Sequence, residues 1–129
     1  MTTNNQMPLG AFSISLAVKD IKKSKQFYEK LGFQVVGGEI TQNWLIMRND
    51  SNTIGLFQGM FKHNVMTFNP GWDSQCNEIN EFVDIRKIHE NLVSSGVEIT
   101  ESNLDNDTGP AHISIVDPDG NAILIDQHR

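Results

Sequence analysis

Residues 20–33, with the sequence DIKKSKQFYEKLGF, decide the fold, because within them one helix begins, ends and leads into a strand. Asp20 is typical of an N-cap, since its carboxylate can accept hydrogen bonds from the free amides of the first helical turn. Phe27, Tyr28 and Leu31 recur at helical spacing, and Gly32 suits the left-handed conformation that ends a helix. The stretch therefore predicts a helix over 21–31 with one apolar side turned to a sheet.

Strand patterns lie on both sides of this helix. Over 12–18, apolar residues alternate with small or polar ones, which is the two-residue period of a strand. After the helix, turn residues separate three further strand candidates, Phe33–Val36, Trp44–Arg48 and Ile54–Phe57. The first half of the chain thus predicts the order strand, helix and three strands.

The same order returns about half a chain later. Asp84 repeats the N-cap 64 residues after Asp20, apolar side chains recur at helical spacing, and Gly96 ends the second helix. Strands are expected at Val97–Thr100, Ala111–Val116 and Ala122–Ile125. Chance agreement between two helices of common length is the alternative. An internal duplication predicts an α+β fold with outer helices and about eight strands around a shared cleft.

Composition restricts the partners and the compartment. The 129 residues include 10 Lys and Arg against 16 Asp and Glu, a net charge of −6. This balance argues against a nucleic-acid groove or a polybasic membrane patch, and favours a small molecule or a second copy as partner. Cys76 is a single cysteine and cannot form an internal disulfide, so a cytoplasmic location is expected. Residues 1–10 are polar at first and are expected to form a flexible tail.

Three segments carry a resemblance to a known family: LAVKD at 16–20, FYEKLGF at 27–33 and DPDGN at 117–121. In combination they resemble the vicinal oxygen chelate superfamily, which includes glyoxalase I, extradiol dioxygenases and the fosfomycin and bleomycin resistance proteins. The resemblance implies one domain over 11–129, built from two βαβββ modules at 11–59 and 77–127. The modules would be related by pseudo-two-fold symmetry around the cleft and joined by an aromatic connection over 60–76. A homodimer is also implied.

The resemblance further implies a divalent metal in the cleft, where it would polarise substrate oxygens. When the family's four metal positions are carried over by register, they fall on Ser13, Gly55, Asn77 and Leu124. A one-residue slip would move the third position from Asn77 to Glu78. A working site needs several His or carboxylate ligands, and neither Gly55 nor Leu124 offers a donor side chain. We therefore expect a cleft with no metal and no cofactor.

The candidate ligand-binding residues are small, apolar or aromatic side chains expected on the inner face or in the connection: Ser13, Ser15, Trp44, Phe57, Trp72, Asn77 and Leu124. Trp72 is either a lid over the cleft or part of a satellite core or dimer contact.

Two residues are candidate general bases, His112 and Glu78. His112 shares a strand face with Ser114, opposite Ile113 and Ile115. That face either lines the cleft or is ordinary and partly exposed. The other histidines, His63, His89 and His128, are expected to be solvent-exposed.

Three functions stay open on this sequence. The first is a glyoxalase-like or bleomycin-resistance-like protein that binds a small, partly apolar molecule without metal. The second is a lyase or isomerase resembling glyoxalase I that uses a single base or a displaced metal site. The third is a dimeric interaction module with a vestigial cleft. The residues do not distinguish a thioester, a catechol or a drug as the ligand.

Overall fold

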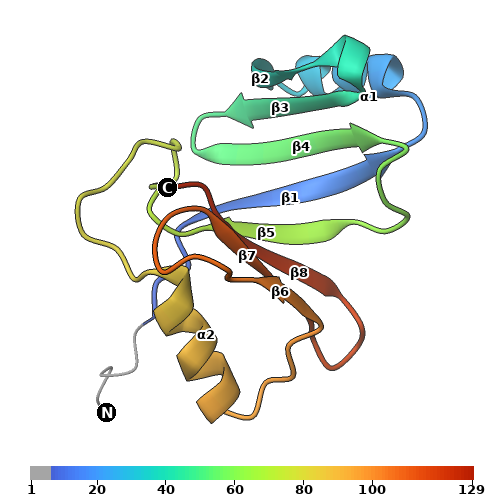
Figure 1. Cartoon of the computed structure of the whole chain (residues 1–129). Helices are drawn as coiled ribbons and strands as arrows, with labels where there is room; N and C mark the ends of the chain where they lie inside the picture. The colour runs from blue at the N-terminus through green and yellow to red at the C-terminus, as the bar shows by residue number, and fades with distance from the viewer. Residues whose placement is uncertain (1–6) are drawn as a thin grey trace, which may run out of the picture. The chain divides into compact units, whose positions relative to one another are not determined.

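The computed structural model describes residues 7–129, which form eight β-strands, two α-helices and one short 3₁₀ helix (Figure 1). The elements follow one another in the order strand, helix and three strands, twice over. The α+β class and the two βαβββ modules are thereby confirmed. The chain divides into two compact units, one of residues 13–66 and the other of residues up to 12 together with 67–129.

The first unit, residues 13–66, holds four strands and one helix. They are β1 (Ala11–Val18), which starts just before the boundary, α1 (Ile21–Lys30), β2 (Gln34–Glu39), β3 (Trp44–Asn49) and β4 (Asn52–Gln58), with the 3₁₀ turn η1 (Ile40–Gln42) before β3. The strand order is β2-β3-β4-β1, with β1 parallel to β4 and the other pairs antiparallel. A parallel first and last strand requires a crossover, which α1 supplies.

The ends of α1 follow the sequence signals. Asp20 Oδ1 accepts hydrogen bonds from the amides of Lys22 and Lys23 at 3.1 and 3.3 Å. The helix ends at Lys30, and Gly32 takes the left-handed conformation with φ of 96°. Both the N-cap and the terminating glycine were predicted correctly.

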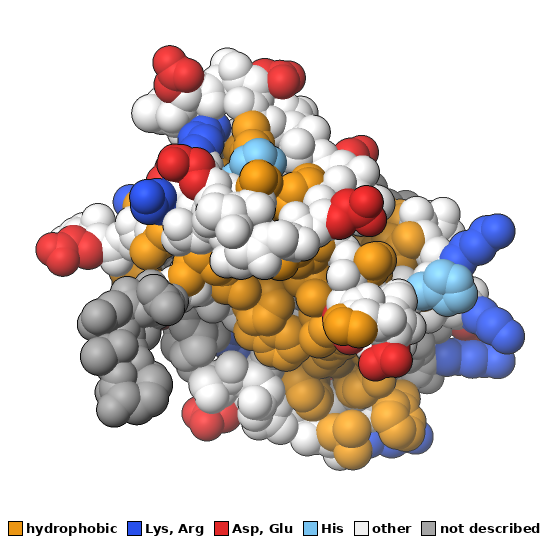
Figure 2. All heavy atoms as spheres, turned by 90° about the horizontal axis from the view of Figure 1, so that it is seen from below, with side chains coloured by type: hydrophobic (Ala, Val, Ile, Leu, Met, Phe, Trp, Pro, Cys, Tyr) orange, Lys and Arg blue, Asp and Glu red, His pale blue; other side chains and the backbone are white. Residues whose placement is uncertain are grey.

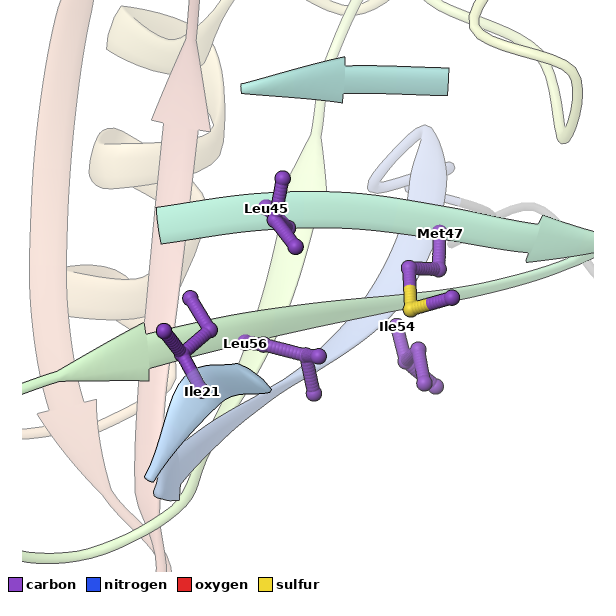
Figure 3. Close-up of a cluster of buried hydrophobic side chains, with 5 residues drawn as sticks. All are labelled: Ile21, Leu45, Met47, Ile54 and Leu56. Carbon is purple, nitrogen blue, oxygen red and sulfur yellow. The ribbon is translucent and has the colours of Figure 1, made fainter. Parts of the chain in front are cut away.

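The core of the first unit lies between α1 and one face of its strands (Figure 3). Its buried side chains come from the start of α1 and from β3 and β4: Ile21, Leu45, Met47, Ile54 and Leu56. Ile14, Leu16 and Val18 of β1 pack against them. Because side chains alternate along a strand, residues 13, 15 and 17 belong to the opposite face, which we call the helix-free face of the first unit.

The second unit contains α2 (Ile85–Ser94), β6 (Glu101–Asn103), β7 (Ala111–Val116) and β8 (Ala122–Gln127), with β5 (Val65–Asn69) at the boundary. The strand order is β8-β7-β6, and both pairs are antiparallel. The side-chain amide of Asn69 donates to the carbonyl of Asp126 at 2.8 Å, which fastens the end of β5 to β8.

The core of the second unit repeats the arrangement of the first. Its buried side chains are Ile85, Ile88, Ala111, Ile113 and Ile125. Met7 and Leu9 pack against this cluster, so the expected flexible tail is packed at these positions, and residues 1–6 lie outside the described residues. Neither α1 nor α2 is long and apolar enough to span a membrane, over the residues that the structure describes.

Three sequence-based boundaries differ from the structure. The segment 60–76 is not only a connection, because it contains β5, the first strand of the second βαβββ series. No strand forms at 97–100: the amide of Val97 bonds to Leu92 at the end of α2, and the strand begins at Glu101 where pairing with β7 starts. The strand predicted to end at Val36 runs on to Glu39, with a register shift between Val35 and Gly37.

Candidate functional site

The helix-free face of the first unit brings four predicted residues onto one surface: Ser13, Ser15, Trp44 and Phe57. The pairing of β1, β4 and β3 aligns their side chains in rows. Ser15 lies beside Gly55 and Gly55 beside Ile46, while Ala17 lies beside Phe57 and Phe57 beside Trp44. The β1 side of this face is therefore small, and its β3 side is large and aromatic.

Three aromatic rings form a row on this face. Trp44 and Phe57 stack nearly parallel, with ring centroids 6.3 Å apart and an interplanar angle of 7°. Phe61, in the loop after β4, tilts against Phe57 at 5.4 Å. Trp44 and Phe57 are half-buried, so each ring is partly available to a ligand. Offset and tilted aromatic pairs of this kind accept a further ring readily.

The ring of Phe57 lies over Gly55. A Cβ built on Gly55 would stand 2.5 Å from Cε2 of Phe57, too close for any side chain while the ring keeps this position. The register-derived metal position on β4 is therefore filled by an aromatic ring, with no room for a ligand side chain at residue 55.

A polar group that the sequence reasoning missed adjoins the aromatic row. Nε of Arg48 donates to Oγ1 of Thr53 at 3.1 Å across the β3·β4 pair. Arg48 lies four residues after Trp44 on β3, so the two side chains share a face. Strand alternation was the signal that could have identified Arg48.

The second unit has a helix-free face of its own, opposite its core. His112 and Leu124 lie on it, on β7 and β8, and His112 is the cross-strand partner of Asp126. Nε2 of His112 is 3.3 Å from Oε1 of Glu101 on β6. Ile113 belongs to the core of the second unit and Ile115 packs against it, which confirms that His112 and Ser114 share the opposite face.

His128 is exposed, as expected, but it also contacts Asp126. Nε2 of His128 lies 3.2 Å from Oδ2 of Asp126, and this hydrogen bond raises the pKa of His128 above its ordinary value. Partial burial opposes the rise, and the negative charge of Asp126 adds to it. Among the other histidines, His63 is exposed as expected, whereas His89 is half-buried.

The remaining predicted residues lie in the segment 70–84, between β5 and α2. Trp72 stacks on His128, with centroids 4.8 Å apart and an interplanar angle of 4°. Glu78 pairs with Trp72 through an isolated bridge and exposes 69% of its side chain. The amide of Asn77 donates to Oδ1 of Asp73 within a turn.

Asn77 therefore does not lie on a sheet strand, and the register that placed a metal ligand there was wrong. That register counts seven residues back from each helix N-cap, from Asp20 to Ser13 and from Asp84 to Asn77. The count holds in the first unit, where β1 runs almost directly into Asp20. In the second unit the segment 70–84 separates β5 from α2. The guanidinium of Arg129 holds this segment by donating to the carbonyls of Gly71 and Ile79 at 3.0 and 2.5 Å.

The residues at the expected metal positions do not fit a divalent ion. Position 55 is closed by Phe57, Leu124 has no donor atom, and Asn77 lies in a turn. Over residues 7–129, no three His, Cys, Asp or Glu side chains gather closely enough to hold a metal ion.

A separate hollow of about 390 Å³ opens on the second unit. Most of its lining is apolar, with Glu81 as the charged exception: Pro8, Gly10, Gly71, Ile79, Glu81, Phe82 and Val83. The guanidinium of Arg129 lies 4.9 Å from the centre of the Phe82 ring beside it. This hollow involves residues other than those predicted to bind a ligand.

Comparison with solved structures gives the same fold at low sequence identity. A glyoxalase/bleomycin resistance protein/dioxygenase superfamily member from Vibrio splendidus is 17% identical, with a TM-score of 0.61, over 90% of this chain and 97% of that one. Methylmalonyl-CoA epimerase from Mycobacterium tuberculosis is 14% identical, with a TM-score of 0.65, over 100% and 93%. A Legionella pneumophila protein described as an NAD-dependent benzaldehyde dehydrogenase is 17% identical, with a TM-score of 0.65, over 92% and 99%.

At these identities the likeness shows the fold alone. A search of curated protein sequences finds no match. The sequence model of the Glyoxalase/Bleomycin resistance protein/Dioxygenase superfamily matches residues 10–125, nearly the whole length. With two βαβββ modules and the motifs at 16–20, 27–33 and 117–121, the chain belongs to the glyoxalase/bleomycin resistance protein/dioxygenase superfamily.

Proposed function

We propose that this protein binds a small, partly apolar molecule carrying a flat or aromatic group, without using a metal, on the helix-free face of the first unit. The observation that carries the proposal is the row of Trp44, Phe57 and Phe61 beside the small residues of β1. A flat apolar ligand would stack on the half-buried rings, beside the small side chains of β1, which leave it room.

The chemistry of this face favours binding over metal-assisted catalysis. The ring of Phe57 takes the place where a ligand side chain at position 55 would begin. The few polar groups, Ser13, Ser15 and the Arg48–Thr53 pair, are suited to orienting a bound molecule. A net charge of −6 likewise supports a small-molecule partner over a nucleic acid, and the single cysteine supports a location in the reducing cytoplasm.

Tryptophan fluorescence tests the proposal. The chain has two tryptophans, so Trp72→Phe leaves Trp44 as the only reporter. Titration with naphthalene-2-carboxylate, a flat aromatic probe, should change Trp44 emission in a saturable way. Phe57→Ala should weaken binding roughly threefold to tenfold, the range for loss of one aromatic contact.

Phe12→Ala is the matched control, because Phe12 is 48% exposed and also pairs with an aromatic ring, that of Phe68. It should leave the Trp44 titration unchanged, with circular dichroism confirming that both variants fold. A titration that does not saturate, or that Phe57→Ala leaves unaltered, would reject the proposal.

A second candidate function rests on His112. Its contact with Glu101 orients the ring on the helix-free face of the second unit, as a general base would need. A lyase or isomerase resembling glyoxalase would then exchange the α-proton of a lactoyl thioester with deuterated solvent, which proton NMR can follow. Exchange should disappear in His112→Asn and persist in His63→Asn. Absence of exchange in both the wild type and the control would reject this second function.

A further inference from the structure

Charge divides unequally between the two units. Residues 13–66 carry seven Lys and Arg against four Asp and Glu, whereas residues 67–129 carry three against twelve. Five of the seven cations lie within residues 19–30, which are α1 and its approach. A chain with an excess of opposite charge in each half has the electrostatic basis for association between copies.

The cations on α1 surround exposed apolar side chains. Phe27 and Leu31 are 55% and 54% exposed. Lys23 lies one turn before Phe27 and Lys30 nearly one turn after it, so all four side chains share one side of the helix. Neither lysine forms an ion pair with a described carboxylate. We call Lys23, Phe27, Lys30 and Leu31 the basic patch.

The second unit presents the complementary pattern. Val116, at the end of β7, is 53% exposed. Asp117 and Asp119 follow it in the turn, and β6 brings Glu101 alongside β7, with Glu98 just before it. We call Glu98, Glu101, Val116, Asp117 and Asp119 the acidic patch. Figure 2 shows one face of the molecule, on which hydrophobic side chains are exposed with Asp, Glu, Lys and Arg side chains scattered around them.

We propose that the basic patch of one copy docks on the acidic patch of a second copy. The apolar centres, Phe27 with Leu31 and Val116, would be removed from water, and the charges around them would pair at the rim. The same chain carries both patches, so it supplies its own partner. The contact is separate from the proposed binding face of the first unit, because neither patch includes Trp44 or Phe57. Glu101 of the acidic patch does contact His112 of the second candidate site.

Salt-dependent self-association is the first measurement. Sedimentation velocity of the full chain should show concentration-dependent dimers or larger species at low salt. At about 0.5 M NaCl, where attraction between exposed charges is largely screened, they should weaken. A monomer at every concentration and salt level would overturn the proposal.

Charge reversal identifies the surfaces. Lys23→Glu with Lys30→Glu should abolish self-association, and so should Glu98→Lys with Asp119→Lys. An equimolar mixture of these two double variants should associate again, since the reversed patches are complementary to one another. Lys62→Glu with Lys87→Glu is the control: it makes the same charge change outside the basic patch and should associate as the wild type does.

The apolar centre and the competing partner each have a test. Phe27→Ser should weaken association about tenfold or more, as for an anchor side chain. Val93→Ser, at an equally exposed valine on α2, should not. Failure of the mixed double variants to associate would overturn the proposal. So would a monomeric wild type that binds vesicles rich in phosphatidylserine through Lys23 and Lys30, which would make the basic patch a membrane surface instead.

Discussion

The backbone amide of Ile85 donates a hydrogen bond to Oε1 of Gln127 at 2.8 Å. In the first unit, the amide of Ile21 donates to Oε1 of Gln58 at the same distance. Each glutamine is the last residue of the fourth strand of its module, and each isoleucine is the first residue of the helix. In both modules this contact satisfies an amide that the first helical turn leaves unpaired.

Gln127→Ala should destabilise the fold more than Gln58→Ala. Gln127 is 1% exposed, and its Nε2 also donates to Asp84, Gly109 and Arg129. Truncation leaves several buried groups unsatisfied, so the free energy of unfolding should fall by about 1–3 kcal/mol. Gln58 is only half-buried and should contribute about 1 kcal/mol. Urea unfolding of both variants checks the order, and equal losses would contradict it.

Asp84 should make stability depend on acid pH. Burial pushes the pKa of Asp84 up, but hydrogen bonds from the Arg86 amide, the Gln127 side chain and the Arg86 guanidinium outweigh it and lower the pKa. The carboxylate therefore stabilises the fold above its unfolded pKa, and this contribution is lost as pH falls through the lower folded value.

Thermal unfolding from pH 6 to pH 3 tests this dependence, by comparison of the wild type with Asp84→Asn. The variant should lose less of its Tm over the acid range, because a neutral amide does not titrate. Asp119→Asn removes an exposed carboxylate and serves as the control. Parallel Tm curves for the wild type and Asp84→Asn would refute the assignment.

Gly55 and Phe57 should be coupled. Gly55→Ala places a Cβ 2.5 Å from the Phe57 ring, so the ring must move, and overpacking of this kind costs about 1–3 kcal/mol. In a Phe57→Leu background the same change should cost clearly less. A double-mutant cycle on the free energy of unfolding measures the difference. Additive effects would show that the ring does not occupy this space in solution.

The contact between Asp126 and His128 should be visible in titration. Asp126→Asn should bring the pKa of His128 down toward its ordinary value, as read from the imidazole NMR signals. The ion pair stabilises the fold below the unfolded pKa of His128 and loses this effect as pH rises through the higher folded value.

Trp72 offers an independent reading of the same titration. Its ring stacks on His128 at 4.8 Å, so in Trp44→Phe its emission should change with the His128 midpoint. Glu101→Gln changes the partner of His112 and leaves Asp126 and His128 intact, so it should leave that midpoint unchanged. A Trp72 emission that is flat across the His128 midpoint would contradict the stacked arrangement.

Local signals allowed most of the fold to be predicted. Asp20 and Asp84 mark helix starts through side-chain chemistry that acts over two or three residues, and Gly32 and Gly96 mark the ends through φ. Period-two alternation likewise identified the faces of β1, β7 and β8. These features depend on near neighbours, which a single sequence displays.

The misplaced features depend on the length of a connection or on tertiary contacts. β5 lies within the aromatic segment 60–76, where no strand was predicted. The residues between β5 and α2 lengthen the connection, so counting seven residues back from Asp84 placed Asn77 on a strand incorrectly. Gln58 and Gln127 act across 37 and 42 residues, and no local motif indicates such a bond. Strand alternation places Arg48 on the same face as Trp44, but a cation is not a metal ligand, so the metal-site pattern did not indicate it.

The register shift between Val35 and Gly37 affects how the protein behaves when concentrated. β2 lies at the edge of its sheet and is almost wholly exposed, with two consecutive valines at 35 and 36. A straight edge of that composition would template the addition of foreign strands and the growth of fibres. The bulge interrupts the row of backbone donors and acceptors, so an incoming strand could not pair continuously, and the sheet is protected from aggregation by its own irregularity.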